Sequence, residues 1–265
     1  MIKAFLQALV YLVIQGTTAF VAAGVYRLIT GATSMPVGLL AAISALSAVI
    51  AIALFLKSRW TVVSRSYLLT RPWLVLLWTV VAALGTVVPS IWLQEHLAWL
   101  PDLSEQQMGE LLLSPWGYVL VVLLVPLAEE VAFRGGMLRA LLSVDGELAA
   151  GRDGRHRVTT LRAWAMIACS ALLFSVCHLN PAQMPHAFLI GLLLGWLYWR
   201  TGSIVPGLVL HVMNNMTSWA LFRLYPSTDI TLTDVLGSQR SVGFAVVFSL
   251  MILLPALFQL RERTE

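Results

Sequence analysis

Charged residues are scarce in this sequence: Asp, Glu, Lys and Arg make up 11% of its 265 positions. A soluble domain carries about 25% of these residues, so the composition argues against one. Apolar residues instead reach 59%, and the mean hydropathy is +0.84. This balance is typical of a polytopic membrane protein, whose first partner is the lipid bilayer.

Cysteine is equally scarce, since Cys169 and Cys177 are the only two in the chain. They fall on one predicted helix, roughly 12 Å apart at the α-helical rise per residue. That separation excludes a disulfide between them. We interpret both as small packing residues.

Apolar segments of about 20 residues, the length that crosses a bilayer, occur along the whole chain. The eight predicted spans are Ala4–Ile29, Pro36–Leu56, Trp73–Leu93, Trp116–Leu142, Leu161–Leu179, Met184–Trp199, Ile204–Phe222 and Val242–Leu260. The first is too long for a signal peptide, and the sixth is short enough to be re-entrant. We therefore predict an all-α polytopic membrane protein, a bundle of about eight transmembrane helices. The polar stretches Glu95–Glu110, Ser143–Arg157 and Tyr225–Ser241 are predicted loops.

The basic residues are unevenly distributed. Eight spans put both termini on one side of the membrane, and thirteen of the 17 Lys and Arg residues fall on that side, against three on the other. The positive-inside rule then predicts cytoplasmic N- and C-termini in a protein of the plasma (inner) membrane. The same distribution accounts for the net charge of +4 without a nucleic-acid partner.

Ionisable residues inside a span are rare, because each costs about 2.5–3.5 kcal/mol at the bilayer centre. Three of the predicted spans contain them. The residues are Glu129, Glu130 and Arg134 in the fourth span, His178 in the fifth, and His211 with Asn214 and Asn215 in the seventh. A water-filled cavity between three helices would satisfy all of them.

Helix geometry separates the two glutamates. Residues four apart share a helix face, so Glu130 and Arg134 can form an ion pair. Glu129 is turned about 100° away and is left to face another partner. A buried carboxylate beside a histidine is suited to general base catalysis, and His or Asn donors can stabilise an oxyanion. The combination predicts a hydrolase of carbonyl compounds, most simply a peptidase.

Each residue alone has a simpler structural interpretation. A Glu–Arg pair in a span is more often a brace, a lone buried histidine is more often a satisfied core residue, and asparagine often bonds a neighbouring helix. The catalytic interpretation depends on their combination, since the other five spans carry almost no charge away from their ends. Asn180 and His186 lie near the edge of a span and are interpreted as loop or interface residues.

Three motifs resemble those of the CAAX-protease and bacteriocin-processing family, also called CPBP or Abi. They are EEVAFRG at Glu129–Gly135, FSVCH at Phe174–His178 and HVMNN at His211–Asn215. They correspond to the family patterns Glu-Glu-x-x-x-Arg, Phe-x-x-x-His and His-x-x-x-Asn, in this order. The family includes type II CAAX prenyl endopeptidases. The resemblance therefore implies an intramembrane endopeptidase that acts on a peptide or membrane-protein substrate, including a lipidated one.

The resemblance also implies a role for each motif residue. Glu129 would activate water together with His178, and His211 and Asn215 would form the oxyanion hole.

The resemblance also implies two supporting residues. It covers roughly Trp116–Phe222, and together with the hydropathy of the other spans it predicts a division of the chain. Glu130 and Arg134 would support the site. Residues 1–110 would form N-terminal transmembrane helices and an outer loop, residues 111–225 the catalytic helices, and residues 226–265 an outer loop and the last span with a cytoplasmic tail.

Metal dependence is the main alternative within this function. Glu129, His178 and His211 could supply three zinc ligands and leave a fourth position for water. However, the residue four after His211 is Asn215, a poor zinc ligand and a good oxyanion donor, and no His-Glu-x-x-His pair occurs. We therefore expect a site without a cofactor, with zinc as the alternative.

Two further functions remain open. Ionisable residues in spans also mark solute pathways in transporters, although a transporter tends to have two related halves and none are visible. A non-catalytic binding or immunity protein would be expected to have lost a motif residue, and none is lost.

We expect the site to lie near the middle of the membrane, open to either face.

Overall fold

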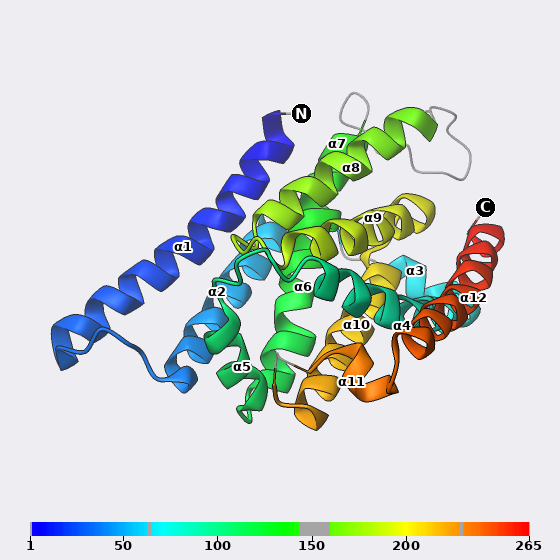
Figure 1. Cartoon of the computed structure of the whole chain (residues 1–265). Helices are drawn as coiled ribbons and strands as arrows, with labels where there is room; N and C mark the ends of the chain where they lie inside the picture. The colour runs from blue at the N-terminus through cyan, green and yellow to red at the C-terminus, as the bar shows by residue number, and fades with distance from the viewer. Residues whose placement is uncertain (1, 63–64, 144–159, 228–229, 265) are drawn as a thin grey trace.

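The protein is described by a computed structural model over residues 2–62, 65–143, 160–227 and 230–264 (Figure 1). This part of the chain is all-α and contains no strand. Its helices are α1 (Ile2–Thr30), α2 (Val37–Lys57), α3 (Arg65–Leu69), α4 (Trp73–His96), α5 (Glu105–Leu113), η1 (Tyr118–Leu124), α6 (Val125–Glu129), η2 (Glu130–Leu138), α7 (Arg139–Leu142), α8 (Thr160–Val176), α9 (Met184–Thr201), α10 (Ile204–Leu224), α11 (Leu232–Leu236) and α12 (Gln239–Arg263). Helices η1 and η2 are π-helical.

The prediction of an all-α polytopic membrane protein is confirmed, but the count of eight spans is not. Among the described residues, four helices are long and apolar enough to cross a membrane: α1, α2, α4 and α12. A fifth span results if α5 and residues 118–142 are counted as one segment, although they are bent by 106°. Helices α9 and α10 are of spanning length, but polar residues lower their hydropathy: His186 and Arg200 near the ends of α9, and His211, Asn214 and Asn215 within α10. A test based on length and hydropathy therefore does not identify α9 and α10 as membrane spans.

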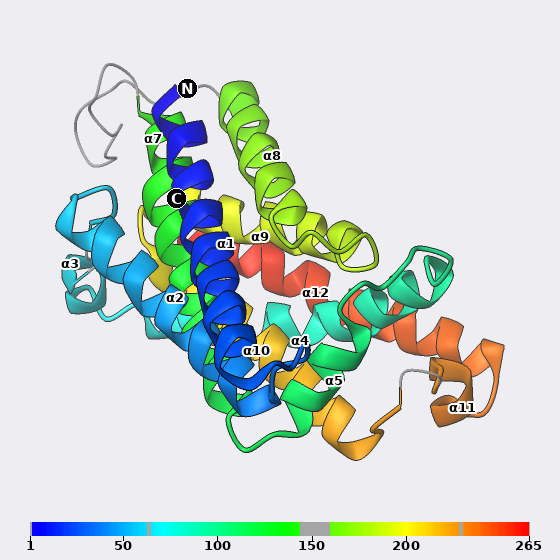
Figure 2. The same cartoon turned by 90° about the vertical axis from the view of Figure 1, so that its left-hand side faces the viewer.

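The helix of residues 118–142 lies at the centre of the fold (Figure 1). Helices α1 and α2 lie in front of it in the view of Figure 2. The η2 part of this central helix contacts α1, α2, α8 and α10, while α4 packs along α12 and α8 packs along α9. One apolar cluster joins α1, α2, η2 and α8 through the buried side chains of Tyr11, Phe55, Phe133 and Phe174. The central helix can therefore hold polar side chains away from lipid.

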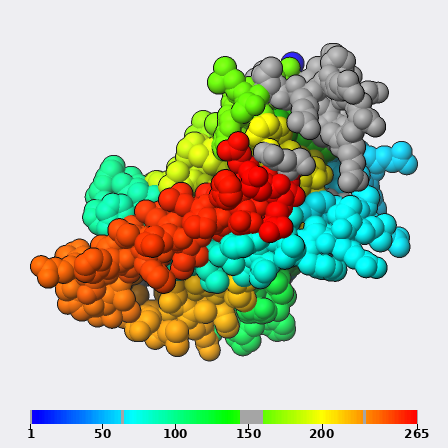
Figure 3. All heavy atoms as spheres, turned by 90° about the vertical axis from the view of Figure 1, so that its right-hand side faces the viewer, coloured from blue at the N-terminus to red at the C-terminus, as the bar shows by residue number. Residues whose placement is uncertain are grey.

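The outer helices present apolar side chains to their surroundings. Phe20 and Leu28 of α1 and Phe244, Phe248 and Phe258 of α12 are all exposed. Figure 3 shows α12 crossing one face of the molecule. Apolar surface of this extent is suited to lipid rather than water.

Helices α8 and α9 approach closely because α9 has glycines at the contact. A Cβ at Gly191 would lie 3.0 Å from that of Ala171, and a Cβ at Gly195 would lie 2.9 Å from Ile167. These two glycines, four residues apart on α9, therefore let the two helix backbones approach closely. The chain then turns at Gly202, with a φ of +64°, and Ser203 caps α10 by accepting from the Val205 N–H.

The predicted loops are shorter than expected. In Glu95–Glu110 only residues 97–104 lie between helices, because α4 continues to His96 and α5 begins at Glu105. Tyr225–Ser241 contains α11 and the start of α12. Most of Ser143–Arg157 lies outside the described residues, and so do three of the basic residues that were counted for topology: Arg152, Arg155 and Arg157.

Candidate active site

The glutamate motif lies on a helix that is locally widened into π-helix. The Val125 N–H donates to the Leu120 carbonyl, five residues earlier. By the same spacing the donor for the Val121 carbonyl would be residue 126, which is proline and has no N–H. The Asn215 side chain supplies the missing donor, with its Nδ2 3.0 Å from the Val121 oxygen. π-helical turns frequently occur at functional sites, and this one binds η1 to α10.

Glu130 and Arg134 form the expected ion pair, with 3.2 Å between Glu130 Oε1 and Arg134 Nη1 and both side chains fully buried. The same Glu130 oxygen lies 3.1 Å from His211 Nδ1. Arg134 Nη2 lies 3.4 Å from the Gly191 carbonyl, and its guanidinium carbon lies 4.3 Å from the centroid of the Phe174 ring. Glu130 therefore connects the glutamate motif to α10, and Arg134 connects it to α8 and α9.

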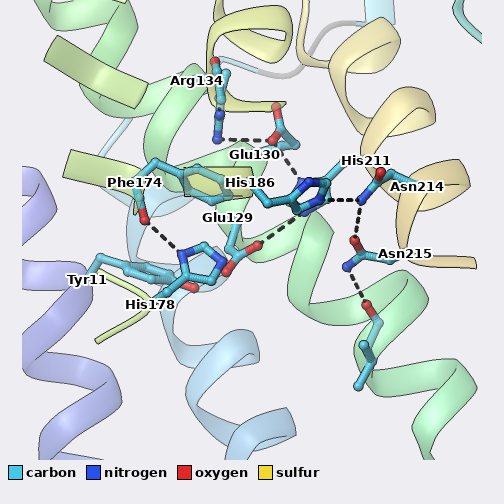
Figure 4. Close-up of polar contacts among 12 residues, drawn as sticks. Tyr11, Glu129, Glu130, Arg134, Phe174, His178, His186, His211, Asn214 and Asn215 are labelled. Carbon is cyan, nitrogen blue, oxygen red and sulfur yellow. Dashed lines mark hydrogen bonds and ion pairs between the residues drawn. The ribbon is translucent and has the colours of Figure 1, made fainter. Parts of the chain in front are cut away.

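Glu129 points to a different part of the site, as expected from its rotation away from Glu130 (Figure 4). Its Oε2 lies 3.5 Å from His211 Nε2, and its side chain is 13% exposed, against 0% for Glu130. His211 thus lies between the two glutamates, with one ring nitrogen toward each. Of the two carboxylates, Glu129 is the one that solvent can reach.

His178 lies beside the Glu129 carboxylate in Figure 4. Its Nδ1 is 2.9 Å from the Phe174 carbonyl. Because a carbonyl only accepts, we assign the proton of the neutral ring to Nδ1, which leaves Nε2 as an acceptor. The Phe174 ring meets the rings of His178 and His211 edge-on, at 4.9 and 5.9 Å between centroids. Phe174 therefore orients both histidines.

The turn after His178 is bound to residues 101–104. The buried Asn180 donates from Nδ2 to Asp102 Oδ1 and to Ser104 Oγ, both at 2.8 Å. Its Oδ1 accepts from the Leu103 N–H at 3.2 Å. Asn180 is thus an interface residue, as predicted, and holds the turn after α8 that carries His178.

Two residues that sequence reasoning did not place in the site lie close to it. His186, in the first turn of α9, has Nε2 3.4 Å from Asn214 Nδ2, and Asn214 in turn lies 3.4 Å from Asn215 Oδ1. Tyr11 of α1 points toward Glu129 and His178 in Figure 4. For Tyr11 a signal did exist, since Gln7, Tyr11 and Gln15 recur every fourth residue and so form a polar stripe on an apolar helix.

The zinc alternative receives no support from the ligand geometry. In the described part of the chain, no three His, Cys, Asp or Glu side chains are arranged so that they could hold a metal ion. The expectation of a site without a cofactor stays a prediction, with Glu129, His178 and His211 as the alternative zinc ligands.

The fold and these contacts define a class, a polytopic all-α membrane protein with a buried site of carboxylates and histidines. Residues 111–217 match the model of one family, the type II CAAX prenyl endopeptidase Rce1-like proteins. The resemblance drawn from the three motifs is thereby confirmed, and the match supports a protease that acts in the membrane. No curated protein and no solved structure matches this chain.

Proposed function

We propose that this protein is a glutamate-type intramembrane endopeptidase, with Glu129 as the general base. The observation that carries the proposal is the position of Glu129. It is the solvent-accessible member of the buried pair and lies 3.5 Å from His211, beside His178. A general base must reach both its water and a group that stabilises the charge that develops.

The reaction uses water as nucleophile. Water donates one hydrogen bond to Glu129 and one to Nε2 of His178. Glu129 takes a proton as the water oxygen bonds to the scissile carbonyl carbon. The resulting oxyanion accepts hydrogen bonds from His211 Nε2 and from the second N–H of Asn215 Nδ2, since the first is bonded to the Val121 carbonyl. Collapse breaks the C–N bond, and the proton passes from Glu129 to the leaving amine.

Charge balance supports this assignment of donors. Both ring nitrogens of His211 face carboxylate oxygens, and ionised carboxylates only accept. We propose that this ring is protonated, since only a protonated ring can donate from both nitrogens. Glu129, Glu130, Arg134 and His211 then sum to zero charge, which limits the cost of burying them.

We propose further that the substrate is a peptide or a membrane protein whose scissile bond enters the bilayer, as it would beside a lipidated residue. The protein would lie in the plasma membrane with cytoplasmic N- and C-termini. A transporter or a non-catalytic binding or immunity protein is less favoured, because the chain carries all three motifs and matches a protease family.

Comparative proteomics of membrane-protein termini tests the function. Cells carrying the wild-type chain are compared with cells carrying Glu129→Gln, which keeps the shape of the side chain. The matched control is Glu110→Gln, an exposed position on α5 where the carboxylate bonds only Gln106 among the described residues. New termini should be present with the wild type and the control and absent with Glu129→Gln. The same termini in all three would refute Glu129 as base.

A further inference from the structure

We propose that Tyr11 of α1 is a further catalytic residue, whose hydroxyl orients the nucleophilic water. This inference rests on the proposed function and extends the active site to a helix outside residues 111–217, the segment that matches the family.

Burial and ring packing fix the position of the Tyr11 side chain and the direction of its hydroxyl. The residue is 3% exposed, and its ring meets Phe133 edge-on at 5.2 Å between centroids. Phe133 meets Phe174 in the same way at 5.3 Å. The ring therefore lies in the aromatic cluster that also orients His178, and the hydroxyl points toward Glu129 and His178 (Figure 4).

A second polar residue of α1 determines which way the hydroxyl proton points. Gln15 Nε2 donates to the Tyr11 oxygen at 2.8 Å, and Gln15 Oε1 accepts from Ser47 of α2 at 3.2 Å. Since the amide group of Gln15 donates to Tyr11, the phenolic proton is left for another acceptor. Within the described residues the Tyr11 hydroxyl donates no hydrogen bond to a protein group.

Three groups then surround one position with complementary hydrogen-bonding roles. Glu129 and Nε2 of His178 accept, and the Tyr11 hydroxyl donates. The hydroxyl makes no direct hydrogen bond to either of them, so a water molecule is the natural group to join the three. Water bound this way uses both of its hydrogens and one lone pair. The other lone pair is directed at the substrate carbonyl, an orientation that lowers the barrier to attack.

A structural role alone does not account for this arrangement. Packing against Phe133 would be satisfied by phenylalanine. The hydroxyl carries a polar group into an apolar span, where an unneeded polar atom is costly, and it needs Gln15 and Ser47 to support it.

The first test is kinetic and uses Tyr11→Phe, which keeps the ring and removes the hydroxyl. The matched control is Tyr26→Phe on the same helix, at a position whose backbone carbonyl bonds Thr30. The probe is a prenylated peptide with a C-terminal tripeptide to be released. Tyr11→Phe should lower kcat about tenfold or more, the loss expected for a misplaced nucleophile, with KM unchanged. Gln15→Leu should lower kcat less. Unchanged kcat in Tyr11→Phe would overturn the proposal.

The second test does not depend on cleavage and so separates this inference from the proposed function. Thermal unfolding in detergent is measured for Tyr11→Phe, Glu129→Ala and the double variant. Water-mediated coupling predicts that Tyr11→Phe changes the midpoint in the wild-type background and has a smaller effect when Glu129 is absent. Additive changes in the thermal midpoint would overturn the proposed link between Tyr11 and Glu129. If the thermal midpoints show coupling between Tyr11 and Glu129 but the wild-type protein cleaves no substrate, the proposed function is refuted instead.

Discussion

Glu130 Oε1 lies 3.1 Å from His211 Nδ1 and 3.2 Å from Arg134 Nη1. One buried oxygen thus binds two cationic or hydrogen-donating groups from two helices. The neighbouring carboxylate of Glu129 makes one ion-pair contact among the described residues, to His211, and is partly exposed. The two glutamates of one motif therefore have different tasks, and each task predicts a different consequence of mutation.

Replacing Glu130 by Gln should impair folding, because the fully buried Arg134 would lose its charge partner. Breaking a buried ion pair by removing one member costs about 3–5 kcal/mol. Glu129→Gln should retain near-wild-type stability while losing activity. The yield of monodisperse protein in detergent and the thermal midpoint distinguish the two variants. Equal stability of both would contradict the assignment of Glu130 as a brace.

Gly207→Ala should lower activity without unfolding the protein. A Cβ at this position would lie 2.9 Å from Glu130 Oε2, so the carboxylate must shift away from α10 and displace His211. A misplacement of about 1 Å can cost on the order of a hundredfold in rate. Gly24→Ala of α1 is the control, since nothing lies within 4 Å of its added Cβ. Cleavage rates that match in the two variants would argue against tight packing of Glu130 on α10.

Metal removal should leave the activity intact. The proposed mechanism uses carboxylate, histidine and amide groups only, so treatment with a chelator followed by desalting should not change kcat. The purified protein should also lack stoichiometric zinc by elemental analysis. Loss of activity that zinc restores would favour the alternative in which Glu129, His178 and His211 are ligands.

Cysteine labelling in intact cells should show cytoplasmic termini. The cysteines are introduced at three exposed positions in a background lacking Cys169 and Cys177. Thr33 follows α1, Thr70 follows α3, and Gln106 lies in the first turn of α5. The positive-inside rule predicts that an impermeant thiol reagent labels Thr33→Cys and Gln106→Cys. It should label Thr70→Cys only after the cells are permeabilised. The inverse pattern would place both termini outside.

The sequence by itself determined the class and the list of motif residues. Low charge and high hydropathy require a lipid environment whatever the topology, and the four-residue spacing of Glu130 and Arg134 puts them on one helix face. These are local properties, so reading along the chain is sufficient. The count of spans was less certain, because α9 and α10 face other helices and their polar residues weaken the signal from composition.

Only the tertiary structure decided which residues from different helices meet. No spacing along the chain shows that His211 lies between Glu129 and Glu130, or that Asn215 supplies the donor that Pro126 lacks. His186 and Tyr11 were not placed in the site for the same reason, since each reaches it from a helix that carries no motif. Contacts between distant segments depend on helix packing, and glycines such as Gly191 and Gly207 permit the close approach on which that packing depends.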